Sequence, residues 1–165
     1  MKKIFFSALC LIIACNMIAC GKKDKSLETF KTEIEEFSYN INEINDTINN
    51  IDSSSSAATV ELLSAFDKID SEFIKLADLP VPSNFANIEI LADKASEYMT
   101  TAVSLYHQAF ADDEYNAPLA NQASQYYAKA IEKVQYIGLL LCGKTISTNS
   151  IGEDSFSVED NILGD

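Results

Sequence analysis

Apolar residues recur at alternating intervals of three and four along most of this chain, which is the spacing of one face of an α-helix. The longest series runs from Leu27 to Ile51 and alternates with Glu, Asn, Asp and Thr, so it predicts one long helix with a solvated outer face. A second series, from Leu62 to Leu79, predicts another helix. We expect that helix to stop at Pro80, because proline lacks a backbone donor and clashes with the preceding turn.

Two further helices are predicted in the second half of the chain. A third apolar series, ending near Ala109, predicts a helix whose N-cap is Ser83 or Asn84. A fourth series begins after Asn116, whose side chain we expect to cap it, and ends before Gly143. Glycine is favoured there because the residue after a helix often needs a left-handed backbone conformation.

Four helices of similar length with short connections predict an all-α, antiparallel up-down-up-down four-helix bundle over residues 27–143. The serine run at 53–56 predicts a turn between the first two helices. The helical phase nevertheless continues through Ser55 and Ala58, which leaves one fused helix as an alternative. Residues 144–165 have little periodicity and hold five acids against one lysine, so they predict an acidic, disordered tail.

The overall charge of the chain argues against a nucleic-acid partner. The chain of 165 residues has 25 acidic residues against 12 basic ones, for a net charge of −13, and each basic residue is lysine. Nucleic-acid binding relies on a basic face and on bidentate arginine contacts to phosphate. We therefore expect no nucleic-acid partner.

The first 19 residues have the pattern of a cleaved leader. Two lysines precede an apolar run from Ile4 to Ile18, which is shorter than the ~20 residues of a membrane-spanning helix. The run ends in Met17-Ile18-Ala19-Cys20, which resembles the lipobox of bacterial lipoproteins, although that family prefers leucine where Met17 stands. The resemblance implies that Cys20 becomes the acylated first residue. It would then anchor the protein to the extracytoplasmic face of the cell membrane through residues 20–26 as a tether.

Two alternatives to cleavage at Cys20 remain open. The segment Ile12-Ile13-Ala14-Cys15 also resembles a lipobox, but cleavage there would leave the apolar Met17-Ile18-Ala19 at the start of the mature chain. The leader could also be cut at a site without cysteine. We favour Cys20, because it directly precedes the polar, lysine-rich segment that follows the apolar run.

The remaining cysteine, Cys142, lies at the predicted end of the fourth helix. Processing at Cys20 removes Cys10 and Cys15 and acylates Cys20 itself, so we expect no disulfide within the mature domain. A catalytic thiol needs a positively charged neighbourhood, and only Lys144 is close in sequence. We expect Cys142 to be a small buried residue.

Candidate catalytic and metal-binding residues are few. His107 is the only histidine, and Ser104 stands where a di-metal bundle would have the glutamate of Glu-x-x-His, so we interpret His107 as a surface or boundary residue. The acids at 112–114 lack the alternating ligands and central glycine of a calcium loop, which favours a solvated loop. We expect no catalytic residue, metal site or cofactor.

Tyrosines gather among alanines in the third and fourth predicted helices, at Tyr98, Tyr106, Tyr126 and Tyr127. Small residues let helices approach closely, and tyrosine rings can fill the remaining space with their hydroxyls at the rim. Packing is therefore one interpretation. The other is a groove between the two helices, lined by these rings, that takes a ligand or partner.

The same region carries a resemblance to a wider group. Through Leu79-Pro80-Val81-Pro82, the segment 105–110 and Tyr126-Tyr127-Ala128-Lys129-Ala130, the chain resembles uncharacterised helical-bundle lipoproteins of low-GC Gram-positive bacteria. This resemblance covers roughly a third of the chain and implies an extracytoplasmic bundle of unknown activity. We expect a non-catalytic binding or scaffolding module with an envelope protein as partner. The alternative is a small-molecule receptor or enzyme with a site between the third and fourth helices.

Overall fold

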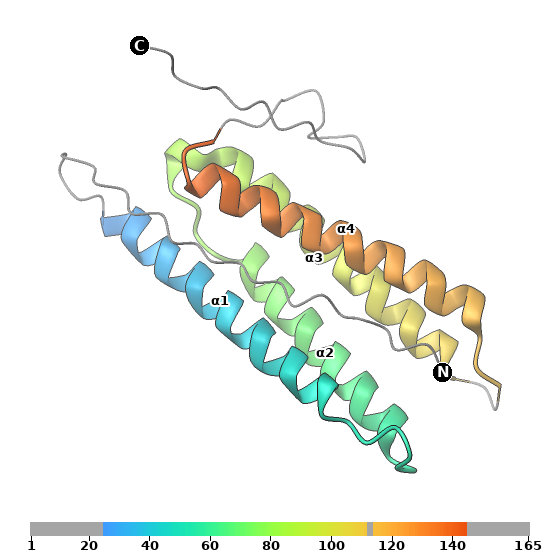
Figure 1. The fold of residues 1–165 in the computed structure, drawn as a ribbon. Coiled ribbons are helices and arrows are strands. Elements are labelled where there is room, and N and C mark those ends of the chain that lie inside the picture. The colour runs from blue at the N-terminus through green and yellow to red at the C-terminus, as the bar shows by residue number, and fades with distance from the viewer. Residues whose placement is uncertain (1–24, 112–113, 145–165) are drawn as a thin grey trace.

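The computed structural model describes residues 25–111 and 114–144, and that part of the chain folds into four α-helices and one short 3-10 helix. These elements are α1 (Lys25–Asn49), α2 (Ala58–Ala77), η1 (Ser83–Phe85), α3 (Ala86–Ala109) and α4 (Ala117–Leu141). Each helix packs antiparallel against the next one along the chain (Figure 1). The prediction of an all-α up-down bundle of four helices is confirmed.

The core lies where the predicted apolar faces meet. In α1 the residues Phe30, Ile34, Phe37 and Ile41 are buried, and the outer face is exposed as the pattern predicted. The ring of Phe37 packs edge-on against Phe73 of α2, with centroids 5.2 Å apart. Each large apolar side chain so buried stabilises the fold by about 1.5–3 kcal/mol. All four helices contribute to this one core.

The serine run forms a turn between α1 and α2, and the alternative of one fused helix is wrong. The carboxylate of Asp52 accepts hydrogen bonds from the Ser54 backbone N–H at 2.9 Å and from the Ser54 hydroxyl at 2.7 Å. The Ser55 hydroxyl accepts one from the Ala57 N–H at 3.1 Å. Such side-chain bonds to neighbouring backbone groups compete with helical ones and stop the helix here.

The start of α3 differs from the prediction. Ser83 and Asn84 do not cap it, because both lie in η1, and α3 begins at Ala86 without a side-chain cap. The Phe85 N–H donates to the Pro82 carbonyl at 2.8 Å, and this tight turn takes up the residues that the pattern assigned to the helix start.

Both ends of α4 follow the prediction. The Asn116 side chain accepts a hydrogen bond from the Leu119 N–H at 3.2 Å and so caps the first turn. At the other end Gly143 has a positive φ of 75°. The Gly143 N–H donates to Leu140 and the Lys144 N–H to Leu139, each at 3.0 Å, which is the Schellman pattern of helix termination.

Several predictions fall on residues 1–24, 112–113 and 145–165, which lie outside the described residues. They are the leader, the lipidated Cys20, most of its tether, the centre of the acidic loop and nearly all of the predicted tail. In the part of the chain that the structure describes, no helix is long and apolar enough to cross a membrane.

Cys142 does not match its prediction. It is the residue after the last turn of α4, it is partly exposed rather than buried, and it is disulfide-bonded in this structure. The prediction of no disulfide assumed processing at Cys20, which removes or acylates the other three cysteines.

Candidate functional site

The predicted tyrosine site divides into two sets along the contact between α3 and α4. Tyr98 of α3 and Tyr126 of α4 form the first set, with ring centroids 6.1 Å apart and planes tilted by 46°. The ammonium group of Lys129 lies 5.5 Å from the centroid of the Tyr98 ring and 5.7 Å from that of Tyr126. Both distances are within the range in which an aromatic face attracts a cation. This set is therefore a partly exposed, two-ring contact that holds an ammonium ion of the chain itself.

Tyr106 and Tyr127 form the second set, which is more deeply packed. The ring of Tyr106 stacks on Phe66 of α2 with centroids 4.3 Å apart. Burial raises the pKa of Tyr106 to about 12, and the hydroxyl of Tyr115 adds to the shift. Burial also raises the pKa of Tyr127 to about 12, and here the hydroxyl of Tyr106 adds to it. These two tyrosines behave as packed, neutral side chains, whereas the question of a ligand groove rests on Tyr98 and Tyr126.

A second candidate region, which the sequence analysis did not identify, is the contact between α1 and α2. An open depression of about 680 Å³ lies next to the turn between these helices. Carboxylates of Glu43, Asp46 and Glu61 line it together with Lys68 and the exposed Val60. The depression combines acidic side chains with apolar ones. The three-four pattern does not mark it, because most of its residues are exposed polar or charged ones outside the apolar series.

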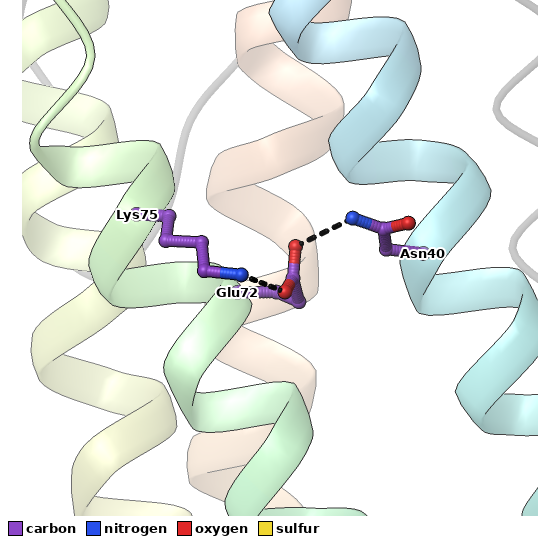
Figure 2. Close-up of polar contacts among 3 residues, drawn as sticks. All are labelled: Asn40, Glu72 and Lys75. Carbon is purple, nitrogen blue, oxygen red and sulfur yellow. Dashed lines mark hydrogen bonds and ion pairs between the residues drawn. The ribbon is translucent and has the colours of Figure 1, made fainter.

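A smaller depression further along the same contact contains a polar cross-link between the helices. Figure 2 shows Asn40 of α1 and Lys75 of α2 approaching Glu72 from opposite sides. The Asn40 amide donates to one carboxylate oxygen of Glu72 at 2.9 Å, and the Lys75 ammonium donates to the other at 2.6 Å. The Glu72 side chain is only 13% exposed.

This environment keeps Glu72 ionised. Burial raises the pKa of Glu72, but the hydrogen bonds from Lys75 and Asn40 and the charge of Lys75 outweigh burial, so the pKa lies below its ordinary value. A general acid at neutral pH needs the opposite shift. Because both oxygens already accept hydrogen bonds from the chain, the geometry suits a link that fixes α1 against α2.

His107 lies at the surface, as predicted. Its Nε2 is 2.6 Å from a carboxylate oxygen of Asp67, and the two side chains are 44% and 57% exposed. A second contact joins the same two helices, since the Thr100 hydroxyl of α3 donates to Asp70 of α2 at 2.7 Å. Both contacts join α2 to α3 at the edge of the core. Among the described residues, no group of three or more His, Cys, Asp or Glu side chains could hold a metal ion.

Comparison with protein-family models, with curated proteins and with solved structures finds no match to this chain. The described part of the chain has four α-helices, and any function proposed for it has to be argued from its own residues.

Proposed function

We propose that this protein is a membrane-anchored, extracytoplasmic lipoprotein whose helical bundle is a non-catalytic binding or scaffolding module. The observation that carries the proposal is the placement of Cys20. It follows a small residue at the end of a short apolar run, and the run itself follows two lysines. Only a leader that is read by a lipoprotein-processing system requires a cysteine at that point.

The folded domain supports this proposal in two ways. The first helix begins at Lys25, five residues after Cys20, so a short tether would connect the anchor to a compact domain. The polar contacts between helices also resemble structural links. Glu72, Asp67 and Asp70 each bond to a side chain of a neighbouring helix instead of converging with others on one cleft. The resemblance to helical-bundle lipoproteins of low-GC Gram-positive bacteria agrees with such a role.

Metabolic labelling with palmitate tests the anchor. The wild-type chain should incorporate label and fractionate with membranes, whereas Cys20→Ala should lose the label and remain unprocessed or be released. Cys15→Ala is the matched control, because it removes a neighbouring cysteine of the same leader and should leave labelling intact. Label that persists in Cys20→Ala and disappears in Cys15→Ala would place the anchor at Cys15. Label that persists in both variants, or is absent from the wild type, would refute a lipid anchor at these cysteines.

A second candidate function is a receptor for a small organic cation at the contact between α3 and α4. The observation that favours it is the pair of partly exposed rings, Tyr98 and Tyr126, that hold the Lys129 ammonium. Aromatic rings around a cation are the usual recognition site for quaternary ammonium groups. Titration with choline should change the tyrosine signals of Lys129→Ala more than those of Lys129→Ala/Tyr126→Ala. Equal responses of the two variants would exclude this site.

A further inference from the structure

A second covered face runs along α4, beside the face that packs into the core. Its members recur at intervals of three and four, which places them on one side of the helix. They are Tyr126, Lys129, Lys133, Tyr136 and Leu140, and each of them is buried or half-buried. We call this set, together with Tyr98 of α3, the lysine–tyrosine face. Of the described residues, Lys133 is the one charged side chain that is buried, at 3% exposed.

The burial of Lys133 needs compensation, because an ammonium group away from water is costly unless anions or other acceptors lie beside it. Its Nζ is 4.0 Å from a carboxylate oxygen of Glu132 and 5.9 Å from the centroid of the Tyr136 ring. The Tyr136 hydroxyl donates to the other oxygen of that carboxylate at 2.8 Å. Glu132 is itself 34% exposed. This surrounding therefore favours a further anion beside Lys133.

The lysine–tyrosine face has a positive balance on a chain that is strongly acidic. Helix α4 contains Lys129 and Lys133 but one acid, Glu132. Across the contact, α3 adds Lys94 at the border of the face, and its ammonium pairs with Glu97 at 2.7 Å. Three lysines against two acids leave a net charge of +1, whereas the whole chain has a net charge of −13.

The other two acids of α3 lie on a different side of that helix. Glu89 and Asp93 precede Thr100 by eleven and seven residues, which are close to three and two whole turns, so they share its side. The Thr100 hydroxyl donates to Asp70, and that side of α3 therefore faces α2. Glu89 and Asp93 do not offset the charge of the lysine–tyrosine face.

Residues 145–165 have the charge and the length to reach this face. The segment directly follows Lys144 and holds five acids and no lysine. Lys133 lies eleven residues before Lys144, which is about 17 Å back along α4. Glu153 lies nine residues after Lys144, so an extended chain can carry it about 30 Å. The first acids of the segment can therefore extend back beyond Lys133.

We propose that the acidic segment 145–165 folds back along α4 and docks on the lysine–tyrosine face, with carboxylates beside Lys133 and Lys129. Of the described helices, only α3 runs close beside α4 over much of its length, so the rest of α4 is open to another segment. The apolar run 4–18 does not match this face, because it contains no acidic residue. The acids of 145–165 supply the anions that the two lysines favour.

The docked segment would cover the rings of Tyr98 and Tyr126. A cation or a partner that binds this contact would then have to displace the segment first. The proposal does not depend on acylation of Cys20, because neither the face nor the docking segment includes the leader. It therefore stands or falls separately from the lipid anchor.

A tryptophan in the segment can report docking, because the chain has no tryptophan of its own. The full-length variant Phe156→Trp places the probe between two pairs of acids, at 153–154 and 159–160. Acrylamide quenching of its fluorescence is compared with that of a synthetic peptide of residues 145–165 with the same substitution. Docking predicts emission at shorter wavelength and a quenching constant several-fold lower than that of the peptide.

A charge reversal on the face tests where the segment docks. Lys129→Glu, added to Phe156→Trp, should raise the quenching constant to the value of the peptide. Lys68→Glu is the matched control, because it makes the same change at an exposed lysine of α2 in the depression beside α1. It should leave the quenching constant low. Far-ultraviolet circular dichroism checks that both variants keep the helical fold.

Three results would overturn the proposal. Quenching of Phe156→Trp as strong as that of the peptide would mean that the segment does not dock. Equal release by Lys129→Glu and Lys68→Glu would mean that overall charge, and not this face, holds the segment. Protection that disappears on dilution would mean that the segment of a second copy occupies the face. Loss of palmitate labelling, in contrast, bears on the anchor alone.

Discussion

Replacing Ile41 by aspartate tests whether the three-four pattern of α1 forms the packed seam of the bundle. The side chain of Ile41 is 1% exposed, whereas its neighbour Asn42 is exposed on the outer face. The variants Ile41→Asp and Asn42→Asp therefore add the same charge one residue apart on the same helix. A second pair repeats the contrast, with Ile137→Asp in α4, where the side chain is also 1% exposed, and Asn49→Asp at the exposed end of α1.

The expected losses in the free energy of unfolding differ by roughly an order of magnitude between the buried and the exposed substitutions. Removing a buried isoleucine side chain costs about 2–5 kcal/mol of the free energy of unfolding. Placing an aspartate carboxyl in the same apolar site without a designed partner adds about 1–3 kcal/mol on the scale of protein substitutions. The total stability of a domain of this size is typically about 5–15 kcal/mol. An exposed substitution such as Asn42→Asp normally changes the free energy of unfolding by about 0.5 kcal/mol or less.

Thermal melts followed by far-ultraviolet circular dichroism separate the two outcomes. The two isoleucine variants should unfold at much lower temperature or fail to accumulate, and the two asparagine variants should melt close to the wild type. Similar losses in both pairs would refute the reasoning. They would mean that added negative charge on an acidic chain, and not the burial of the substituted side chain, controls the stability.

The shifted pKa values give two further predictions. Because the pKa of Glu72 lies below its ordinary value, its contribution to stability is present above the unfolded pKa of about 4.5 and is lost as the pH falls through the folded pKa. The acid limb of a stability–pH curve should be shallower in Glu72→Gln. Because burial raises the pKa of Tyr127 to about 12, its contribution is present below the unfolded value of 10.0 and is lost as the pH rises toward 12. An ultraviolet titration should show late-ionising tyrosines in the wild type and one fewer in Tyr127→Phe.

The features of the fold that depend on local chemistry could be predicted from the sequence. The stripe from Leu27 onward predicted α1, because burial on one side of a helix requires that spacing whatever the partner helix is. Asn116 and Gly143 marked the ends of α4 because capping bonds form within a few residues of the chain. The start of α3 could not be predicted in this way. The 3-10 turn at Pro82 competes with a serine or asparagine cap, and the local sequence fits both.

The tyrosine contacts depend on how the helices align along their length. The apolar spacing within each helix does not determine that alignment. The pattern identified Tyr98, Tyr106, Tyr126 and Tyr127 as one group. In the structure Tyr106 stacks on Phe66 of α2, whereas Tyr98 lies against Tyr126. The sequence spacing could have predicted the contact of Lys129 with Tyr126. It lies three residues after Tyr126 and therefore on the same face of α4, where its ammonium can reach the ring.

The cross-link between α1 and α2 is harder to find for the same reason. Glu72 and Lys75 are three residues apart on one helix, so their ion pair follows from sequence spacing alone. Asn40 is 32 residues before Glu72, and only the packed arrangement brings its amide to the second carboxylate oxygen. With that bond in place, Glu72 fixes the hairpin of α1 and α2 without interrupting the apolar core beneath it.

These polar links lie at the edges of the helix contacts, and this placement bears on where a partner could bind. Three side-chain bonds join neighbouring helices from α1 through α3, namely Asn40–Glu72, Asp67–His107 and Asp70–Thr100. The polar groups at these helix contacts are therefore already bonded within the chain. A partner that competed for these side chains would have to break contacts that hold neighbouring helices together. The acidic depression next to the turn between α1 and α2 contains none of these residues. A partner that binds this depression would leave those bonds between the helices intact.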